Sequence, residues 1–182
     1  MDRFVIRGGA PLEGVIQVSG SKNAGLPIPI AAAILGTTDS LITNVPDLQD
    51  MRTMANLLRH LGTEVELGDG TLHLGASDTL SVEAEYDLVR RMRASIYVLG
   101  PLLARFGEAR VSFPGGCAIG ARPVDIHLRG MEALGAEIHV EHGFIIAKAP
   151  KLRGAELSLL GPHGTSVGAT ANVMMAATLA EG

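Results

Sequence analysis

A run of helix, glycine, strand, turn and strand occurs twice in this chain of 182 residues, and it restricts the fold more than any other feature. Segments 57–65 (LLRHLGTEV) and 130–138 (GMEALGAEI) align, and their glycines, Gly62 and Gly135, stand 73 positions apart. Three further glycines after predicted helices recur at intervals of 71 and 75 residues: Gly36, Gly107 and Gly182. Periods of this length indicate structural repeats that share a hydrophobic core.

Each repeat is expected to be a βαβαββ unit, which makes the predicted fold class α/β (α+β). Apolar residues at helical spacing predict helices, and alternating apolar residues predict strands. The predicted helices span 26–35, 48–61, 86–105, 124–134 and 166–179. The predicted strands span 4–7, 15–18, 40–45, 63–67, 71–74, 109–113, 136–140, 144–148 and 155–160. Asp47 is expected to cap the second helix, and Met51 and Met54 are expected in the core.

A third unit begins near residue 155, and the sequence ends at Glu181-Gly182, where the next strand of that unit is expected. Repeats of this kind bury their apolar faces against one another, so an interrupted unit is left without part of its core. We therefore expect a chain truncated at its C-terminus.

Composition excludes several classes of protein. A net charge of -4, no tryptophan and 3% aromatic residues leave no basic stacking surface, so no nucleic acid is expected as a partner. The longest apolar stretch, 26–35, contains two prolines and is too short to span a bilayer. The N-terminus lacks the pattern of a signal peptide, and a single cysteine excludes an internal disulfide. These features predict a cytoplasmic protein with no membrane segment.

The only cysteine, Cys117, lies in a glycine-rich stretch at residues 113–125 (FPGGCAIGARPVD). Glycines let backbone N–H groups approach a ligand closely, and Pro123 stands near a helix start, where free N–H groups attract anions. A thiol five residues before Arg122 is a candidate reactive group. A buried, unreactive cysteine is the alternative interpretation from composition alone.

A second candidate for anion binding is the polar turn at residues 19–25 (SGSKNAG), which precedes a predicted helix. Lys22 would stand near the N-terminus of that helix. The turn lacks the glycine spacing of a Walker loop, so an ordinary capped helix start is the alternative.

Three stretches, SGSKN at 19–23, RMRAS at 91–95 and PGGCAIGARP at 114–123, resemble those of the bacterial UDP-N-acetylglucosamine 1-carboxyvinyltransferases, a family of enolpyruvyl transferases. The resemblance covers essentially the whole chain. It implies two domains built from six βαβαββ units around a cleft, an inside-out α/β barrel. Residues 21–182, with about two and a half repeats, would form most of one domain. Residues 1–20 would belong with the second, absent domain.

The resemblance also implies the reaction. This family transfers the enolpyruvyl group of phosphoenolpyruvate to the 3′-hydroxyl of UDP-N-acetylglucosamine, with loss of phosphate, as the first committed step of peptidoglycan synthesis, and no cofactor is expected. Addition of the hydroxyl to the double bond of phosphoenolpyruvate requires a general acid above that bond and cations around the phosphate and carboxylate. Cys117 matches the general acid of the family, which can form a covalent adduct with phosphoenolpyruvate and is alkylated by the inhibitor fosfomycin.

Further residues would bind the substrates by the same resemblance. Lys22 and Arg122 match the cations that hold phosphoenolpyruvate, Asn23 lies beside Lys22, and Arg93 matches an arginine near the bound substrates. The residues implied to line the nucleotide sugar are Arg122, Pro123, Val124, Asp125 and Ile126, together with Gly164, Thr165, Ser166, Val167 and Gly168. The chain departs from the family at residues 162–165 (PHGT), just before Ser166, where a lysine often stands. The base for the sugar hydroxyl and a further arginine would lie in the absent half.

The remaining histidines show no ligand spacing, so they are expected on the surface or on helix faces, and no metal site is expected. They include His60, His73, His127, His139 and His142.

Two other functions remain open at this point. The enolpyruvyl transferase of the shikimate pathway normally has a serine after the entry lysine and no cysteine loop, whereas this chain has Asn23 and Cys117. A non-catalytic domain that binds a nucleotide sugar is the second alternative. We expect the 182-residue chain alone to be inactive, because half of the cleft would be absent.

Overall fold

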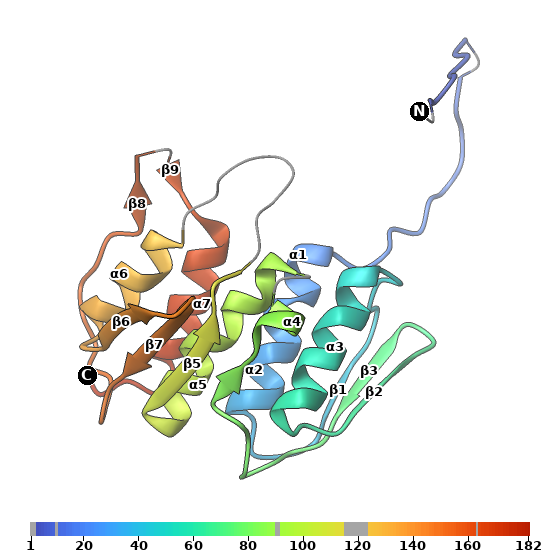
Figure 1. Cartoon of the computed structure of the whole chain (residues 1–182). Coiled ribbons are helices and arrows are strands. Elements are labelled where there is room, and N and C mark those ends of the chain that lie inside the picture. The colour runs from blue at the N-terminus through green and yellow to red at the C-terminus, as the bar shows by residue number, and fades with distance from the viewer. Residues whose placement is uncertain (1–2, 10, 90–91, 115–123, 163) are drawn as a thin grey trace.

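The computed structural model describes residues 3–9, 11–89, 92–114, 124–162 and 164–182. Helices and strands alternate along most of the described chain (Figure 1). The helices are α1 (Lys22–Gly25), α2 (Pro27–Leu35), α3 (Gln49–Leu61), α4 (Tyr86–Val89), the 3₁₀ helix η1 (Arg93–Val98), α5 (Leu99–Phe106), α6 (Asp125–Ala133) and α7 (Val167–Ala177). The strands are β1 (Ser40–Ile42), β2 (Val65–Gly68), β3 (Thr71–Leu74), β4 (Glu83–Ala84), β5 (Glu108–Ser112), β6 (Glu137–Glu141), β7 (Phe144–Lys148), β8 (Leu160–Gly161) and β9 (Gly164–Thr165).

The predicted βαβαββ unit is complete in residues 83–148. Its four-stranded sheet has the order β4-β5-β7-β6, in which β4 and β5 are parallel and the other pairs are antiparallel. Residues 22–74 repeat the pattern without a first strand, and their antiparallel sheet has the order β1-β3-β2. The prediction of an α/β fold with repeated units is confirmed.

Equivalent turns of the two units adopt the same backbone conformation. Gly62 after α3 and Gly135 after α6 have φ angles of 107° and 93°. The hairpin turn 69–70 has φ angles of 50° and 71°, and the turn 142–143, again 73 positions later, has 49° and 79°. Two successive positive φ angles give the tight turn that suits twisted antiparallel strands. The sequence repeat therefore corresponds to a structural repeat.

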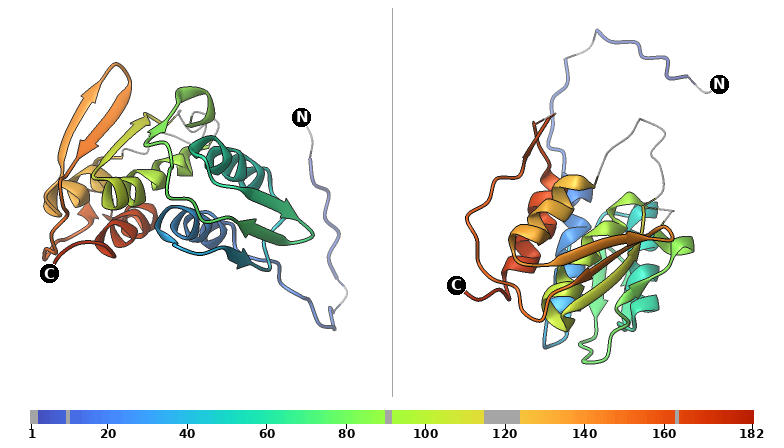
Figure 2. Two further views of the ribbon diagram at one scale, coloured as in Figure 1. Left: turned by 90° about the horizontal axis from the view of Figure 1, so that it is seen from below. Right: turned by 60° about the vertical axis from the view of Figure 1, so that its left-hand side comes forward.

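Helices α2, α5 and α7 pack against one another and supply much of the core. Figure 2 shows these helices side by side, with the three-stranded sheet next to α2 and α3 and the four-stranded sheet next to α5. Ile30 and Ile34 of α2 and Leu102 of α5 are fully buried. Met51 and Met54 are also fully buried, as predicted.

The N-terminal segment departs from prediction. Residues 3–9 and 11–19 contain no strand, so the strands predicted at 4–7 and 15–18 are wrong for this chain. Phe4 and Val15 are 98% and 100% exposed, and the segment extends away from the body of the molecule (Figure 1). Alternating apolar residues favour a strand, but a strand also needs a neighbour to pair with.

The single helix predicted over residues 86–105 is also wrong, because the structure divides it into α4, η1 and α5. Pro101 has no N–H, and its ring would clash with the carbonyl four residues earlier in a continuous helix. An α-helix accepts proline only in its first turn, and α5 begins two residues before it, at Leu99.

Two further local predictions are wrong. Asp47 does not cap α3, because its carboxylate accepts a hydrogen bond from Arg52 at 2.5 Å and Leu48 is the N-cap residue. The strand predicted at 155–160 is reduced to β8, which pairs with β9 in a short hairpin.

No helix in the described part of the chain has the length and apolar character needed to cross a bilayer.

Candidate functional site

Most of the described residues predicted to bind substrates lie where helices begin. Lys22 opens α1, Arg93 opens η1, Asp125 opens α6 and Val167 opens α7. The first residues of α1, α6 and α7 lie toward the same end of the molecule, the upper end in Figure 1. The first N–H groups of α6 and α7 have no intrahelical acceptor and therefore suit an anion.

Lys22 and Asn23 form one group with a carboxylate that sequence reasoning missed. The side-chain oxygen of Ser21 accepts a hydrogen bond from Ala24 N at 3.4 Å and caps α1. Lys22 Nζ forms an ion pair with Asp50 Oδ2, and the two side chains are 52% and 30% exposed. Asn23 is exposed beside them. Asp50 lies in the first turn of α3, where a negative charge is favourable, but no motif marks it in the sequence.

The start of α6 lies beside the β8–β9 hairpin. Val124 is buried, Asp125 is exposed and Ile126 is half-buried. A Cβ atom on Gly161 would lie 2.6 Å from the Ile126 side chain, so the two segments are in close contact. Arg129 Nη2 donates to the Leu160 carbonyl at 2.9 Å and fixes the hairpin to α6.

The start of α7 has a side-chain cap. Ser166 Oγ accepts a hydrogen bond from Ala169 N at 3.2 Å. Val167 is exposed, whereas Gly168 lies against Tyr97 of η1: a Cβ atom there would be 2.8 Å from the Tyr97 hydroxyl. The exposed Gly164 and Thr165 form β9, just before this cap.

Tyr97 links the two segments that were predicted to line the nucleotide sugar. Its hydroxyl touches Gly168, and its ring stacks on His127 of α6, with centroids 6.2 Å apart and planes at 27°. Burial raises the pKa of the Tyr97 hydroxyl, while the charge of Arg93 lowers it. The structure therefore brings residues 124–126, residues 166–168 and η1 into one group.

His127 was predicted to be a surface or helix-face residue, and the structure places it on the buried face of α6 rather than on the surface. The residue is 4% exposed, and its Nδ1 lies 3.1 Å from Nδ2 of the buried Asn172. Burial, and to a smaller extent the charge of Arg93, lower the pKa of His127 to about 4, although Asp125 acts in the opposite direction. The helical spacing of His127 with Val124 and Met131, which are both buried, was the available signal.

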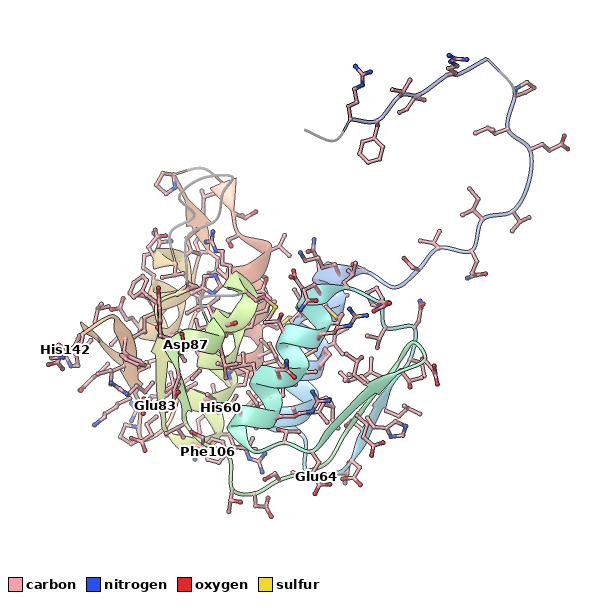
Figure 3. The ribbon with its side chains drawn as sticks, turned by 45° about the vertical axis from the view of Figure 1, so that its right-hand side comes forward. His60, Glu64, Glu83, Asp87, Phe106 and His142 are labelled. Carbon is pink, nitrogen blue, oxygen red and sulfur yellow. The ribbon has the colours of Figure 1, made fainter. Side chains whose placement is uncertain are left out.

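The other described histidines are exposed, as predicted: His60, His73, His139 and His142. Figure 3 shows His60 on α3 and His142 at the tip of the β6–β7 hairpin, well apart from each other. Among the described residues, no three histidine, cysteine or acidic side chains gather as a metal site. Cys117, Arg122 and Pro123 lie outside the described residues.

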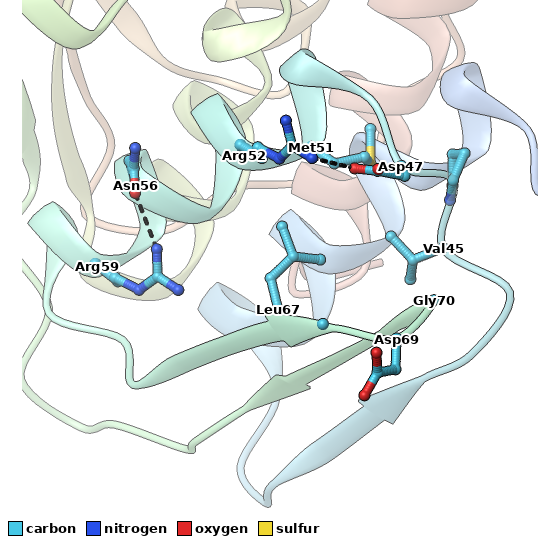
Figure 4. A pocket seen from close by; sticks show the side chains of 11 residues that line it. Val45, Asp47, Met51, Arg52, Asn56, Arg59, Leu67, Asp69 and Gly70 are labelled. Carbon is cyan, nitrogen blue, oxygen red and sulfur yellow. Dashed lines mark hydrogen bonds and ion pairs between the residues drawn. The ribbon is translucent and has the colours of Figure 1, made fainter.

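A separate cavity of about 660 Å³ lies between α3 and the β2–β3 hairpin (Figure 4). Its two arginines bind protein acceptors: Arg52 pairs with Asp47, and Arg59 bonds to Asn56 at 2.9 Å and to the Val65 carbonyl. None of the described residues predicted to bind substrates lines this cavity. We assign it no role.

Comparisons with known proteins add to this geometry. A sequence model of the EPSP synthase family, described as 3-phosphoshikimate 1-carboxyvinyltransferase, matches residues 6–182. Proteins named UDP-N-acetylglucosamine 1-carboxyvinyltransferase are 56% identical over 182 residues in Desulforapulum autotrophicum and 55% identical over 183 residues in Trichlorobacter lovleyi. Both matches cover 100% of this chain and 43% of the relative, so the chain spans less than half the length of these curated relatives.

Solved structures give the same fold. The enolpyruvyl transferase NikO from Streptomyces tendae matches with a TM-score of 0.76 and 26% identity, over 96% of this chain and 40% of that one. EPSP synthase from Acinetobacter baumannii matches with a TM-score of 0.67 and 17% identity, over 93% of this chain and 39% of that one, which shows the fold alone.

Proposed function

The chain belongs to the EPSP synthase family, and from this premise we propose that it supplies part of the active site of a UDP-N-acetylglucosamine 1-carboxyvinyltransferase. Such an enzyme transfers the enolpyruvyl group of phosphoenolpyruvate to the 3′-hydroxyl of UDP-N-acetylglucosamine and releases phosphate. The observation that carries the proposal is 56% identity over the whole chain to a protein of that name. The chain spans 43% of that relative, so the complete activity is assigned to a protein of the relative's length.

The proposed phosphoenolpyruvate side of the site consists of Lys22, Asn23, Arg122 and Cys117. Lys22 and Arg122 would neutralise the phosphate and carboxylate, and Cys117 would protonate the methylene carbon while the sugar hydroxyl loses its proton. The ion pair between Lys22 and Asp50 supports this assignment, because it keeps the cation oriented yet half-exposed, ready for an anionic ligand.

The proposed nucleotide-sugar side consists of Arg93, residues 122–126 and residues 164–168. The contacts of Tyr97 with both His127 and Gly168 support this assignment, because they join segments from α6 and α7. The helix start at Val167 provides free N–H groups for a diphosphate.

The domain organisation is also a proposal. Residues 21–182 would form most of one domain, and residues 1–20 would pack with a second domain of the complete protein. The exposed apolar side chains of the N-terminal segment, such as Phe4, Ile6 and Ile16, support the second part, since exposed apolar groups are covered in a finished fold. We place the protein in the cytoplasm, where it would serve cell-wall synthesis and hence cell shape and division.

The shikimate-pathway reaction is the weaker candidate. The chain is 17% identical to a solved EPSP synthase but 56% identical to a UDP-N-acetylglucosamine enzyme. Phosphate release with UDP-N-acetylglucosamine, but not with shikimate 3-phosphate, as the acceptor is the expected result in a protein of the relatives' length.

Fosfomycin labelling tests the role of Cys117 in the same protein. We expect one fosfomycin molecule on the peptide that contains residues 113–125, with loss of transferase activity. A Cys117→Ala variant should take up no label, which controls for other nucleophiles. Full activity with an unmodified Cys117 after treatment would overturn the assignment.

A further inference from the structure

Asn172 of α7 joins three other elements through its side chain. It is fully buried, and its Nδ2 donates to the Ile96 carbonyl of η1 at 2.9 Å. Its Oδ1 accepts from the Gly100 amide of α5 at 3.0 Å. Its Nδ2 also lies 3.1 Å from Nδ1 of His127 in α6. One side chain therefore fixes α7 to η1, α5 and α6.

These bonds determine the tautomer of His127. A backbone amide only donates and a backbone carbonyl only accepts, so Gly100 and Ile96 fix which end of the Asn172 amide is oxygen and which is nitrogen. An amide nitrogen only donates, so His127 Nδ1 must accept and carries no proton. The neutral ring therefore carries its proton on Nε2.

The backbone of Gly100 lies close against Asn172. A Cβ atom on Gly100 would lie 2.5 Å from both the carbonyl oxygen and Oδ1 of Asn172. Real Cβ atoms do not approach main-chain oxygen that closely, so η1 and α5 must pull away from α7 if Gly100 is replaced. The network is set by main-chain contacts as well as by side-chain bonds.

We propose that His127 and Asn172 form a positioning pair, which holds the start of α6 at a fixed separation from η1 and from the start of α7. Through Tyr97, the pair sets residues 124–126 relative to residues 166–168, the two segments proposed to bind the nucleotide sugar. The inference rests on the proposed function. Neither member of the pair is assigned a contact with substrate.

The charge state of the pair matters because charged groups face the imidazole. Arg93 approaches from η1 and Asp125 from α6 itself, whereas α5 and α7 present the Gly100 amide and the Asn172 amide, which do not titrate. Tyr97 adds a neutral phenol. A neutral His127 keeps a second positive charge away from Arg93.

An Asn172→Asp variant tests the pair, in a protein of the relatives' length. The new carboxylate has no hydrogen to donate to Ile96 or His127, so His127 must take up a proton to bond with it. As pH rises, His127 loses that proton, and the buried carboxylate then keeps only the Gly100 amide as a hydrogen-bond donor. We expect the KM for UDP-N-acetylglucosamine to rise about tenfold or more. It should rise further with pH, because the buried carboxylate then loses protonated His127 as its charged partner.

Two readouts separate positioning from a general loss of structure. The KM for phosphoenolpyruvate should rise less than that for UDP-N-acetylglucosamine, because Lys22 and Asn23 lie on α1, outside the pair, and only Arg122 among the proposed phosphoenolpyruvate cations adjoins α6. Asn56→Asp makes the same chemical change on the exposed face of α3, next to Arg59, and should leave both KM values and their pH dependence unchanged. Equal losses for both substrates, or a flat pH profile in the Asn172→Asp variant, would overturn the positioning role.

The tautomer of His127 can be measured in the unsubstituted protein. Imidazole ¹⁵N spectra of the unsubstituted protein should show His127 with an unprotonated Nδ1 and a protonated Nε2 from pH 6 to 8. A proton on Nδ1 would overturn the pair even if the enzyme is active. Absence of any UDP-N-acetylglucosamine binding by the unsubstituted protein would instead refute the proposed function. The spectra would still show whether His127 and Asn172 form the hydrogen-bonded pair.

Discussion

The ion pair between Lys22 and Asp50 shows how a single residue can prepare a site. Asp50 holds the Lys22 ammonium beside the first turn of α3, yet the pair is partly exposed. Exposed ion pairs add little to stability, so its value lies in orientation.

An Asp50→Asn variant should therefore affect binding more than folding. We expect the KM for phosphoenolpyruvate to rise about fivefold, which corresponds to about 1 kcal/mol, with a nearly unchanged melting temperature. Asp47→Asn is the matched control, because it breaks the exposed pair with Arg52, five residues from Asp47. An unchanged KM for phosphoenolpyruvate in the Asp50→Asn variant would argue against an orienting role.

Burial of His127 predicts how stability depends on pH. Its pKa falls from 6.5 to about 4 on folding, chiefly by burial, so the unfolded chain binds more protons than the folded chain between these values. Stability is then fully present above pH 6.5 and is lost as pH falls toward 4. Between pH 7.5 and 5 this one group should remove about 2 kcal/mol of unfolding free energy.

Urea unfolding at the two pH values measures this loss. A His127→Gln variant should lack that part of the pH dependence, whereas His60→Gln, at an exposed position on α3, should retain it. The same slope in the His127→Gln variant and the unsubstituted chain would contradict the assignment.

At the residue scale, the sequence predicts burial of a side chain only where the spacing of apolar residues shows which face of a helix is buried. Met51 and Met54 were placed correctly because helical spacing shows the buried face. The burial of His127 was not predicted, because a polar residue on a helix face is expected to be exposed unless its partner, here Asn172 from another helix, is known. The Lys22–Asp50 pair was missed for the same reason, since it joins two elements.

At the scale of elements, local signals determined the helices well. The structure has α6 at Asp125–Ala133 and α7 at Val167–Ala177, close to the predicted 124–134 and 166–179. Caps, apolar spacing and terminal glycines lie within the segment itself, so sequence shows them. Strands 4–7 and 15–18 failed because no described strand pairs with them. Within the helix predicted at 86–105, Pro101 accounts for the separate start of α5 at Leu99.

The cap of α7 gives a prediction at the same scale. Ser166→Ala removes the acceptor for the Ala169 amide and should cost about 1 kcal/mol of unfolding free energy. It should also weaken UDP-N-acetylglucosamine binding, because the start of α7 would fray. Ser166→Thr keeps the hydroxyl and should restore most of the stability in a thermal melt. Equal melting temperatures for the Ala and Thr variants would show that the cap does not stabilise the helix.

At the scale of the whole molecule, the described N-terminal segment contributes no side chain to the described core. The apolar side chains of residues 3–9 and 11–19 are exposed, and the described core is made by α2 to α7 with their sheets. Deletion of residues 1–19 from the 182-residue chain should therefore leave its melting temperature unchanged, measured by circular dichroism. Deletion from Val167 onward removes the buried Asn172 and Ala176 and should abolish cooperative unfolding. A large destabilisation by the N-terminal deletion would show that the segment packs on the body.

Strand β1 of the first repeat corresponds to β5 of the second repeat. Of these two strands, only β5 is hydrogen-bonded to a strand on both sides, to β4 and β7. Within the described chain β1 pairs with β3 alone, so its other border presents main-chain donors and acceptors without a protein neighbour. A border of this kind accepts an extended peptide, including one from another copy of the same chain. Concentrated solutions of the isolated polypeptide should for this reason be handled as an aggregation-prone sample, with charged additives or a short complementary peptide to shield that border.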